Sequence, residues 1–315
     1  MSRISDRADR RRGDATSGPR PLADEGLPGP ADAPAGAPMS GVPGDAEPHL
    51  VDPEAGPVTG TSPPPPDNVV VELRDLYKGF GPKKILKGVN LAIERGTSGV
   101  VLGGSGTGKS VLTKHVVGLL QPDKGEVWVL GERLDLMTPE QLDRKRTRLG
   151  YLFQGGALFD SMTVYENMRF FLDRLTTLTR DEKDDLIQES LEDVNLPQTS
   201  KQYPAELSGG QKKRIGLART LILRPDIILY DEPTTGLDPV SVRVVSELIV
   251  KLRDTRGISS IAITHDLLAA EIITDKAFFL LDGQIAASGT LDEVRHSDIP
   301  ALKEFFQGTD AYGHA

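Results

Sequence analysis

The sequence predicts an α/β fold, in which a largely parallel, mixed sheet carries helices and follows a disordered tail. Strand-sized apolar runs alternate with helix-sized runs through residues 68–315, which is typical of α/β domains. One of these strands runs directly into a glycine-rich turn and then into a helical run. The first 67 residues differ in composition from the rest, so the folded part is expected to begin at residue 68.

Residues 1–67 carry 14 of the 23 prolines and no Phe, Tyr or Trp. They hold 6 Lys and Arg against 11 Asp and Glu, a local charge of −5. Such a segment cannot bury enough apolar surface to offset the chain entropy lost on folding. We therefore expect a disordered tail that ends in the proline run Pro63–Pro66, locally extended as polyproline II.

The composition of the whole chain excludes several classes of protein. Without Cys, the chain can form neither a disulfide scaffold nor a Cys-based metal or redox site. A net charge of −9 gives no electrostatic support to nucleic-acid binding. No apolar run approaches the roughly 18 residues of a membrane span, and no secretory signal follows Met1. Any membrane association is expected to be peripheral, through a partner.

Short runs rich in apolar and β-branched residues predict the strands of the first half. These strands are expected at Val69–Leu76, Val89–Ile93, Ser98–Leu102, Gly125–Leu130 and Leu149–Phe153.

The segment of about residues 161–223 is predicted to be a mostly helical insert. Thr163 with Glu166, and Thr179 with Glu182, fit capping boxes, in which the two side chains satisfy free amides at a helix start. Strand-helix alternation then resumes. Its strands are expected at Ile227–Tyr230 and Ile258–Thr264, and its helices at Val242–Leu252 and Leu267–Ile273.

The glycine-rich turn has the pattern of a phosphate-binding loop. It follows the strand Ser98–Leu102 and precedes the helical run Val111–Leu120, which is the context that this motif requires. Glycines allow several backbone N–H groups to point at one phosphate, and the helix start adds partial positive charge. Lys109 can reach the β- and γ-phosphates, and the Ser110 hydroxyl can ligate Mg²⁺. The predicted loop comprises Gly103, Gly104, Ser105, Gly106, Thr107, Gly108, Lys109 and Ser110, and Val111 directly after it is a further candidate nucleotide contact.

Two carboxylates follow the apolar strand Ile227–Tyr230. In open α/β sheets the ligand lies beyond the carboxyl ends of the strands. We expect Asp231 to hold the Mg²⁺ shell and Glu232 to polarise the attacking water as general base. The cofactors implied are ATP and Mg²⁺.

These motifs resemble those of the ATP-binding cassette (ABC) ATPase family, over about residues 69–307. Leu207-Ser-Gly-Gly-Gln211 matches the signature motif of the family, and Gly236-Leu-Asp238 matches its D-loop. By this resemblance Gln154 is the Q-loop glutamine that senses Mg²⁺ and γ-phosphate, His265 is the switch histidine, and Phe80 is the aromatic that stacks on adenine. The resemblance implies a P-loop NTPase core of ABC type with the helical insert as a subdomain.

The resemblance also implies that one chain is not enough to form a complete ATP site. Ser208, Gly209 and Gly210 precede the helical run Lys212–Leu223 and would form a second positive helix start. In the family this surface covers the ATP held by a second cassette, so the partner is a second ATPase subunit, as a homodimer.

The segment after Gln154 resembles the Mla/Mce-type lipid-transport ATPases, which have Gly-Ala-Leu-Phe after the glutamine. Val111 fits that group too, because most cassettes have Thr there. The resemblance implies a multi-span permease, an Mce-domain lipid carrier, and a place at the cytoplasmic face of the inner membrane, with membrane contact only through the permease. Residues 154–163 would line the groove for the permease, with Phe159 and Met162 as candidate contacts.

Other interpretations stay open at this point. Amino-acid and lipoprotein transport ATPases share this length, and a soluble clamp without a permease is a candidate from a different class. Near the C-terminus, Ser297–Phe306 predicts a short amphipathic helix with Ser297 as its N-cap and an apolar stripe that faces its own core or a partner.

Overall fold

The computed structural model describes residues 62–310 of the protein. The predicted disorder of residues 1–61 therefore lies outside the described residues. Ser62–Asp67, by contrast, belong to the described part and contact it: Ser62 Oγ donates to Glu126 Oε1 at 2.8 Å, and Arg74 Nη1 donates to the Pro63 carbonyl at 2.7 Å. The end of the predicted tail thus lies against the folded part, because its proline carbonyls still accept hydrogen bonds.

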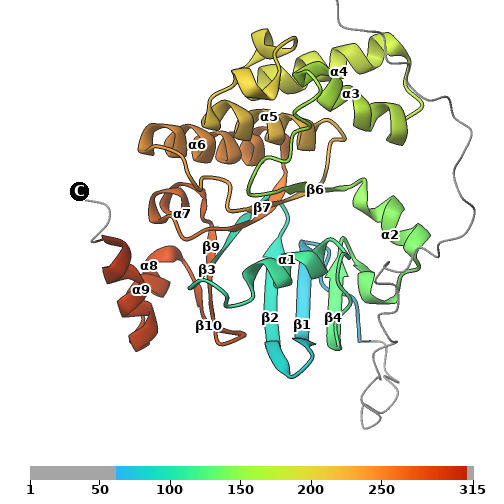
Figure 1. Ribbon diagram of the computed structural model, residues 1–315. Helices are drawn as coiled ribbons and strands as arrows, with labels where there is room; N and C mark the ends of the chain where they lie inside the picture. Colours follow the sequence, from blue (N-terminus) through green and yellow to red (C-terminus); the bar gives the residue numbers. More distant parts are fainter. Residues whose placement is uncertain (1–61, 311–315) are drawn as a thin grey trace, which may run out of the picture. The chain divides into compact units, whose positions relative to one another are not determined.

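Strands and helices alternate in the order that the sequence predicts (Figure 1). The strands are β1 (Val69–Phe80), β2 (Lys83–Glu94), β3 (Ser98–Leu102), β4 (Lys124–Val129), β5 (Glu132–Arg133), β6 (Leu149–Leu152), β7 (Ile227–Asp231), β8 (Ser259–Ile263), β9 (Lys276–Leu281) and β10 (Gln284–Gly289). The α-helices are α1 (Lys109–Val116), α2 (Pro139–Arg146), α3 (Val164–Leu175), α4 (Arg180–Asp193), α5 (Gly209–Leu221), α6 (Pro239–Arg256), α7 (Leu267–Ile273), α8 (Leu291–Arg295) and α9 (Pro300–Asp310).

A six-stranded sheet, in the order β10-β9-β3-β8-β7-β6, forms the centre of the fold. Its strands from β9 to β6 are parallel, and β10 is an antiparallel edge strand. Val100 of β3 pairs with Ala262 of β8 on one side and with Ala277 of β9 on the other. Every residue of β3 and β8 is buried, as expected for strands of a parallel sheet covered on both faces. The predicted α/β class with a mixed sheet is confirmed.

A second, antiparallel sheet has the order β2-β1-β4-β5. The sequence predicts its first two strands at Val69–Leu76 and Val89–Ile93, but they extend to Phe80 and from Lys83 into one long hairpin. The predicted strands are shorter because lysines and glycines interrupt the extra residues at 78–79, 83–84 and 87–88, and these residues weaken the apolar strand signal. Gly81, with φ 56°, supplies the left-handed residue of the connecting turn.

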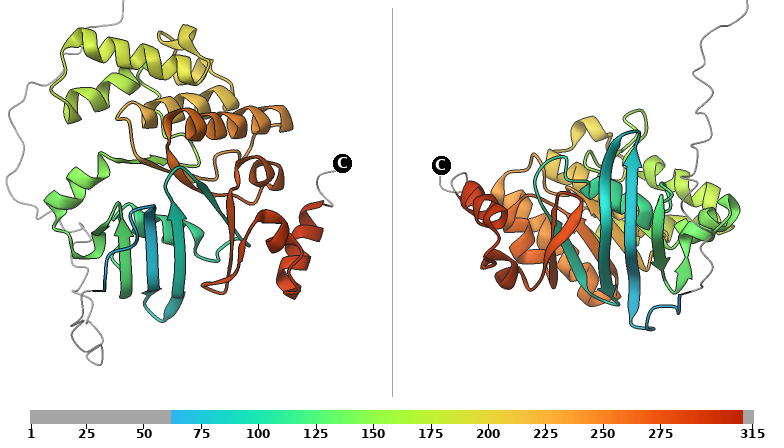
Figure 2. Two further views of the ribbon diagram at one scale, coloured as in Figure 1. Left: turned by 180° about the vertical axis from the view of Figure 1, so that it is seen from behind. Right: turned by 90° about the horizontal axis from the view of Figure 1, so that it is seen from below.

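Helices α3, α4 and α5 lie together beyond the sheet edge that carries β6 and β7, away from β1 and β2 (Figures 1 and 2). Both predicted capping boxes are present. The Thr163 hydroxyl accepts from the Glu166 amide at 3.3 Å, and the Thr163 amide donates to Glu166 Oε2 at 2.7 Å. Thr179 and Glu182 repeat this pair at the start of α4. The helical character of this stretch is thus set locally at its helix starts.

Two hydrophobic clusters hold the sheet from opposite faces. Val100 and Leu102 belong to the cluster beneath α3–α7, whereas Val101 belongs to the cluster shared with the antiparallel sheet and α1. Alternate residues of a strand point to opposite faces, so β3 is fixed on both sides. The loop that follows β3 therefore starts from a rigid base. Within residues 62–310, no helix has the length and apolar character needed to cross a bilayer.

The C-terminal helix differs from its prediction. Helix α9 begins at Pro300 and continues to Asp310, rather than running over Ser297–Phe306. The Ser297 hydroxyl accepts from the Ile299 amide at 3.4 Å, ahead of the helix, so Ser297 forms a turn and Pro300 sets the first helical residue. Its apolar stripe packs on the chain's own core, where the rings of Phe305 and Phe279 lie 5.3 Å apart.

Candidate functional site

The predicted phosphate-binding loop connects the buried end of β3 to the start of α1. Gly103 has φ 147°, and a Cβ there would lie only 2.4 Å from the Leu280 carbonyl oxygen of β9. Gly108, the N-cap of α1, has φ 107°. These two positions require glycine for space and for backbone conformation. The loop thus curves tightly against β9 and delivers its amides to the N-terminus of α1.

Lys109 spans the concave side of this loop. Its Nζ donates to the carbonyl oxygens of Gly103 and Gly104, both at 2.8 Å. An ammonium group has three N–H donors, so one remains for an anion in the loop. Burial lowers the pKa of Lys109, while the negative charges of Glu232 and Asp231 oppose that shift. The lysine is a desolvated cation that an anion in the loop would contact directly.

A cavity of about 620 Å³ opens in front of the loop. It brings together most of the predicted site residues from β3, α1, β6, β7 and the end of β8, as expected for the carboxyl edge of a parallel sheet. Its lining residues are Ile85, Gly103, Gly104, Ser105, Gly106, Gly108, Lys109, Ser110, Val111, Gln154, Asp231, Glu232, Ile263, His265 and Phe305.

The predicted metal ligands offer oxygen atoms on one side of this cavity. The Ser110 hydroxyl donates to Asp231 Oδ1 at 3.3 Å, and Gln154 lines the same space. Among residues 62–310 no group of three or more His, Cys, Asp or Glu is placed to hold a metal ion. Mg²⁺ is commonly bound by one or two carboxylates together with substrate phosphates and water. A hydroxyl, one carboxylate and an amide beside a phosphate loop fit that ion.

Glu232 lies next to Asp231 and is held on several sides. His265 Nδ1 lies 2.9 Å from Glu232 Oε2, and the Thr235 hydroxyl donates to the same oxygen at 3.0 Å. The backbone of Glu232 has φ 52°, a left-handed conformation that non-glycine residues adopt at a cost. Its amide donates to the Ile263 carbonyl at 3.0 Å. The turn therefore aims this carboxylate into the cavity.

A second buried cation braces the same region from behind. Lys213 of α5 donates to the Gln154 carbonyl and, at 3.3 Å, to the Glu232 carbonyl. Burial lowers the pKa of Lys213, and the charges of Glu232 and Asp231 oppose the shift. Sequence reasoning did not identify this lysine, which couples the Q-loop to the turn that carries the predicted base.

Two predicted nucleotide contacts lie outside the lining of the cavity. Phe80 stands at the end of β1 with 49% of its surface exposed, and Lys78 Nζ lies 5.6 Å from its ring centroid. Thr107 donates to the Gly104 carbonyl at 3.0 Å and so braces the loop. Adenine stacking by Phe80 stays a prediction.

The signature residues lie at the N-terminus of α5 and do not line the cavity. Ser208 caps this helix in a capping box with Gln211, whose amide donates to the Ser208 hydroxyl at 3.3 Å. Ser208 and Gly209 are exposed. A Cβ on Gly210 would lie 3.1 Å from Ser241 Oγ, so the signature packs closely on the start of α6. Asp238, of the predicted D-loop, caps that same helix through the Val240 and Ser241 amides.

Besides Lys213, further lining and supporting residues were missed from the sequence. Ile85 and Phe305 approach the cavity from β2 and α9, and only tertiary packing brings them there. Tyr151 lies behind the metal-side oxygens and donates to Asp231 Oδ2 at 3.0 Å. Burial raises the pKa of Tyr151 to about 12. A tyrosine three residues before the Q-loop glutamine, in an otherwise apolar strand, was the available signal.

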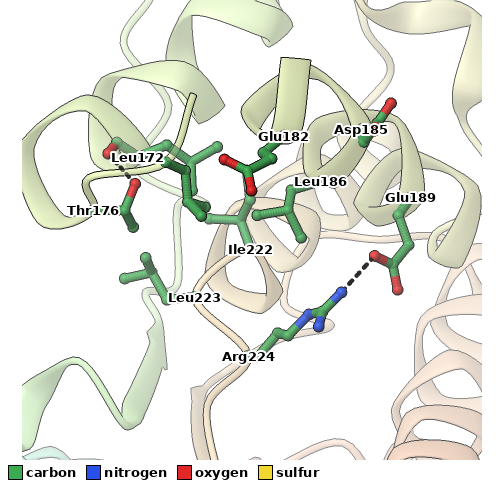
Figure 3. Close-up of a pocket in the computed structure, with 10 residues that line it drawn as sticks. Leu172, Thr176, Glu182, Asp185, Leu186, Glu189, Ile222, Leu223 and Arg224 are labelled. Carbon is green, nitrogen blue, oxygen red and sulfur yellow. Dashed lines mark hydrogen bonds and ion pairs between the residues drawn. The ribbon is translucent and has the colours of Figure 1, made fainter. Parts of the chain in front are cut away.

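A separate cavity of about 450 Å³ lies among α3, α4 and the end of α5 (Figure 3). Half of its lining residues are apolar, with Leu172, Leu186 and Ile222 pointing inward, and acidic side chains of α4 stand at its edge. Arg224 Nη2 donates to Glu189 Oε2 across one end at 3.0 Å. It has no phosphate-binding loop, so the candidate site is the cavity at the carboxyl edge of the sheet.

Comparison with known proteins finds one matching family and several similar proteins. The family described as "ABC transporter" matches residues 86–235. The Arabidopsis thaliana protein TRIGALACTOSYLDIACYLGLYCEROL 3, chloroplastic, is 39% identical over 77% of this chain and 74% of its own length. The "Probable ribonucleotide transport ATP-binding protein mkl" of Mycobacterium leprae is 38% identical over 77% of this chain and 70% of its own length. The Escherichia coli intermembrane phospholipid transport system ATP-binding protein MlaF is 34% identical over 76% and 89%.

Solved structures agree with these relatives. CbiO1 from Clostridium perfringens, part of the ABC transporter complex cbiONQ, superimposes with a TM-score of 0.69 at 28% identity, over 78% of this chain and 98% of that one. A dimeric ATP-binding cassette in a post-hydrolysis state, bound to ADP and Pi, superimposes with a TM-score of 0.64 at 29% identity, over 70% and 98%.

Proposed function

The chain belongs to the ABC transporter family, and from this premise we propose that its ATPase activity powers the transport of phospholipid or another hydrophobic molecule. The observation that carries the ATPase part is the shared cavity, in which the loop lysine, the Ser110–Asp231 oxygens and Glu232 face one another. The cargo rests on the relatives whose printed names refer to phospholipid or to a glycolipid.

In the proposed reaction, the loop amides and Lys109 bind the β- and γ-phosphates of ATP. Ser110, Asp231 and Gln154 would hold Mg²⁺, which when bound neutralises charge on the phosphate oxygens. The loop is already braced by the bonds from Lys109 Nζ to Gly103 and Gly104. Little reorganisation is therefore needed when the triphosphate enters, and preorganised positive charge of this kind is the main means of catalysing phosphoryl transfer.

Glu232 is the proposed general base. It orients a water molecule for attack on the γ-phosphorus and accepts a proton from it, while the bond to the β-phosphate oxygen breaks and ADP leaves. His265 keeps the carboxylate in place through its Nδ1, 2.9 Å from Oε2. Because its side chain is 58% exposed, His265 can also reach a γ-phosphate in the cavity.

We propose that the working unit is a homodimer in which each ATP is held between two chains. The support is that Ser208 and Gly209 are exposed, beside the half-buried Gly210, at a helix start away from the cavity of their own chain. A helix start with free amides attracts anions. A second chain, placed head to tail, would bring its signature over this loop, and related cassettes have been solved as dimers.

Mixing two inactive variants tests the shared site. Lys109→Ala disables the loop and Ser208→Arg disables the signature, so either homodimer is expected to lack hydrolysis. A mixed dimer combines the intact loop of the Ser208→Arg chain with the intact signature of the Lys109→Ala chain, and ATPase activity should return. As a control, Lys109→Ala mixed with the double variant must stay inactive. No recovery in the first mixture, with both variants folded by circular dichroism, would contradict the shared site.

Residues 154–163, just before and at the start of the helical insert, are proposed to line the groove that receives the permease. Phe159, after the Q-loop, is 39% exposed and packs with Phe170 and Phe171 of α3, with ring centroids 5.2 and 6.5 Å away. Arg219 donates to the Gly156 and Ala157 carbonyls and so holds the intervening segment in place. Exposed aromatic rings of this kind often anchor partner segments. Met162 is the other proposed contact, and its amide donates to the Phe159 carbonyl at 3.1 Å.

The proposed assembly places the protein at the cytoplasmic face of the inner membrane, held there by a multi-span permease and working with an Mce-domain lipid carrier. Affinity purification from detergent-solubilised membranes, followed by mass spectrometry, tests this. Recovery of a permease, an Mce-domain subunit and bound lipid is the expected result.

The cargo is tested on the recovered complex by its ATPase rate. Phospholipid is expected to stimulate the rate, and a ribonucleotide other than ATP is the comparison that the printed name of the mycobacterial relative motivates. Stimulation by ribonucleotide alone, or a permease of amino-acid or lipoprotein type, would replace the lipid proposal. Recovery of soluble partners only would support a clamp without a permease.

A further inference from the structure

A tyrosine hydroxyl lies directly behind the carboxylate proposed to hold Mg²⁺. Tyr151, in β6, donates to Asp231 Oδ2 at 3.0 Å, while the other oxygen, Oδ1, accepts from Ser110 at 3.3 Å. An ionised carboxylate only accepts hydrogen bonds, so the tyrosine must be the donor. Asp231 Oδ2 is thus hydrogen-bonded to Tyr151 of β6, and Oδ1 faces Ser110 and the cavity.

The tyrosine is itself fixed from two sides. Its hydroxyl lies 3.3 Å from the Thr113 hydroxyl of α1, and its ring centroid lies 4.4 Å from that of Phe153. Because the tyrosine proton goes to Asp231, the single Thr113 proton is shared between this contact and the Ser110 carbonyl, which also lies 3.3 Å from the Thr113 hydroxyl. The chain of contacts therefore joins α1 and the end of β7, which carry Ser110 and Asp231, with β6, which precedes Gln154.

We infer that Tyr151 is a positioning residue for the metal: its hydroxyl fixes the orientation of the Asp231 carboxylate so that Oδ1 and Ser110 Oγ face one ion together. Free rotation of the Asp231 carboxylate would spread Oδ1 over positions that do not meet Ser110. Groups that orient a ligand from behind typically change metal affinity about 10- to 100-fold when removed. This inference rests on the proposed magnesium site.

Tyr151→Phe tests the inference, since it removes the hydroxyl and keeps the ring against Phe153. Binding of Mn²⁺, measured by electron paramagnetic resonance in the presence of a non-hydrolysable ATP analogue, is expected to weaken about tenfold or more. Affinity for the analogue in EDTA should change less than about twofold, because no phosphate contact is lost. Tyr165→Phe is the matched control, since Tyr165 donates to Asp184 at 2.6 Å outside the cavity. It should leave both affinities unchanged.

A double-variant cycle shows whether the hydroxyl acts through the carboxylate. In an Asp231→Asn background, Tyr151→Phe should add little further loss of Mn²⁺ affinity, because the group that it orients is already altered. The inference would be overturned if Tyr151→Phe weakened analogue binding in EDTA as much as it weakened Mn²⁺ binding. It would also be overturned if Tyr151→Phe lowered Mn²⁺ affinity as strongly in the Asp231→Asn background as in the parental protein. If the parental protein bound no Mn²⁺ with the analogue, the proposed metal site would fail instead. If the parent and Tyr151→Phe bound it equally, only the inference would fail.

Discussion

Glu232→Gln should abolish ATP hydrolysis while leaving ATP bound. General base catalysis contributes about 10²- to 10⁴-fold to a rate, so a loss of at least about 100-fold in the ATPase rate is expected. Glutamine keeps the size of the side chain, and its carbonyl oxygen can still accept from His265 and Thr235, which now contact Glu232 Oε2. Removing a negative charge that faces the γ-phosphate also lowers repulsion. ATP affinity is therefore expected to stay the same or rise.

The same variant should accumulate as a closed dimer, because hydrolysis is the step that opens it. Size-exclusion chromatography with ATP and Mg²⁺ measures the dimer, and phosphate release measures the rate. Glu247→Gln is the matched control: it lies on α6, 3.9 Å from Arg243, with 60% of its side chain exposed. It should hydrolyse ATP at the parental rate. Hydrolysis at that rate by Glu232→Gln would show that another group is the base.

Lys109→Ala should remove productive ATP binding. A hydrogen bond to a charged group contributes about 1.5–3 kcal/mol, and about 1.4 kcal/mol corresponds to tenfold in affinity, so at least about tenfold weaker binding is expected. The loss has a second cause. Without the ammonium group, no positive charge of Lys109 would offset the repulsion between the polyphosphate and the carboxylates of Asp231 and Glu232. Because Nζ also ties the Gly103 and Gly104 carbonyls, the loop loses its internal brace as well.

Two further variants serve as controls for Lys109→Ala. Lys109→Met keeps the buried stem without charge or donors, so it should bind ATP as weakly as Lys109→Ala but with less loss of thermal stability. Lys251→Ala removes an exposed lysine on α6 and should leave affinity unchanged. Fluorescence titration with a labelled ATP analogue measures all of them. Parental affinity in a folded Lys109→Ala protein would contradict the phosphate-loop assignment.

Much of the site follows from local sequence signals. The loop between Ser98–Leu102 and Lys109 is predictable because its glycines, its strand and its helix are neighbours in the chain. The capping threonines Thr163 and Thr179 are predictable for the same reason, since each box is completed three residues later. Asp231 and Glu232 line the cavity because a parallel strand delivers the residues at its carboxyl end to one edge of the sheet.

The rest depends on contacts between distant segments. The sequence of the β1–β2 hairpin does not predict that it joins β4 in a separate sheet, since its alternation of apolar and polar residues would fit either sheet. Phe305 enters the cavity because α9 packs on Phe279, which no local pattern states. Tyr151 occupies a strand position where an apolar residue would also fit, and its hydroxyl gains meaning only beside Asp231. The start of α9 was misplaced because the Ser297 signal lies before a proline that sets its own helix start.

The order of strands in the central sheet has a consequence for how the protein is made. β3, which carries the phosphate loop, pairs through Val100 with Ala262 and Ala277, both far later in the chain. During synthesis the N-terminal part emerges first, and pairings between distant strands form slowly. Strand β3, which leads into the phosphate-binding loop, therefore cannot pair until β8 and β9 have left the ribosome. A nascent chain that stops before Ser259 should not bind nucleotide, because β3 then has neither of its two neighbouring strands.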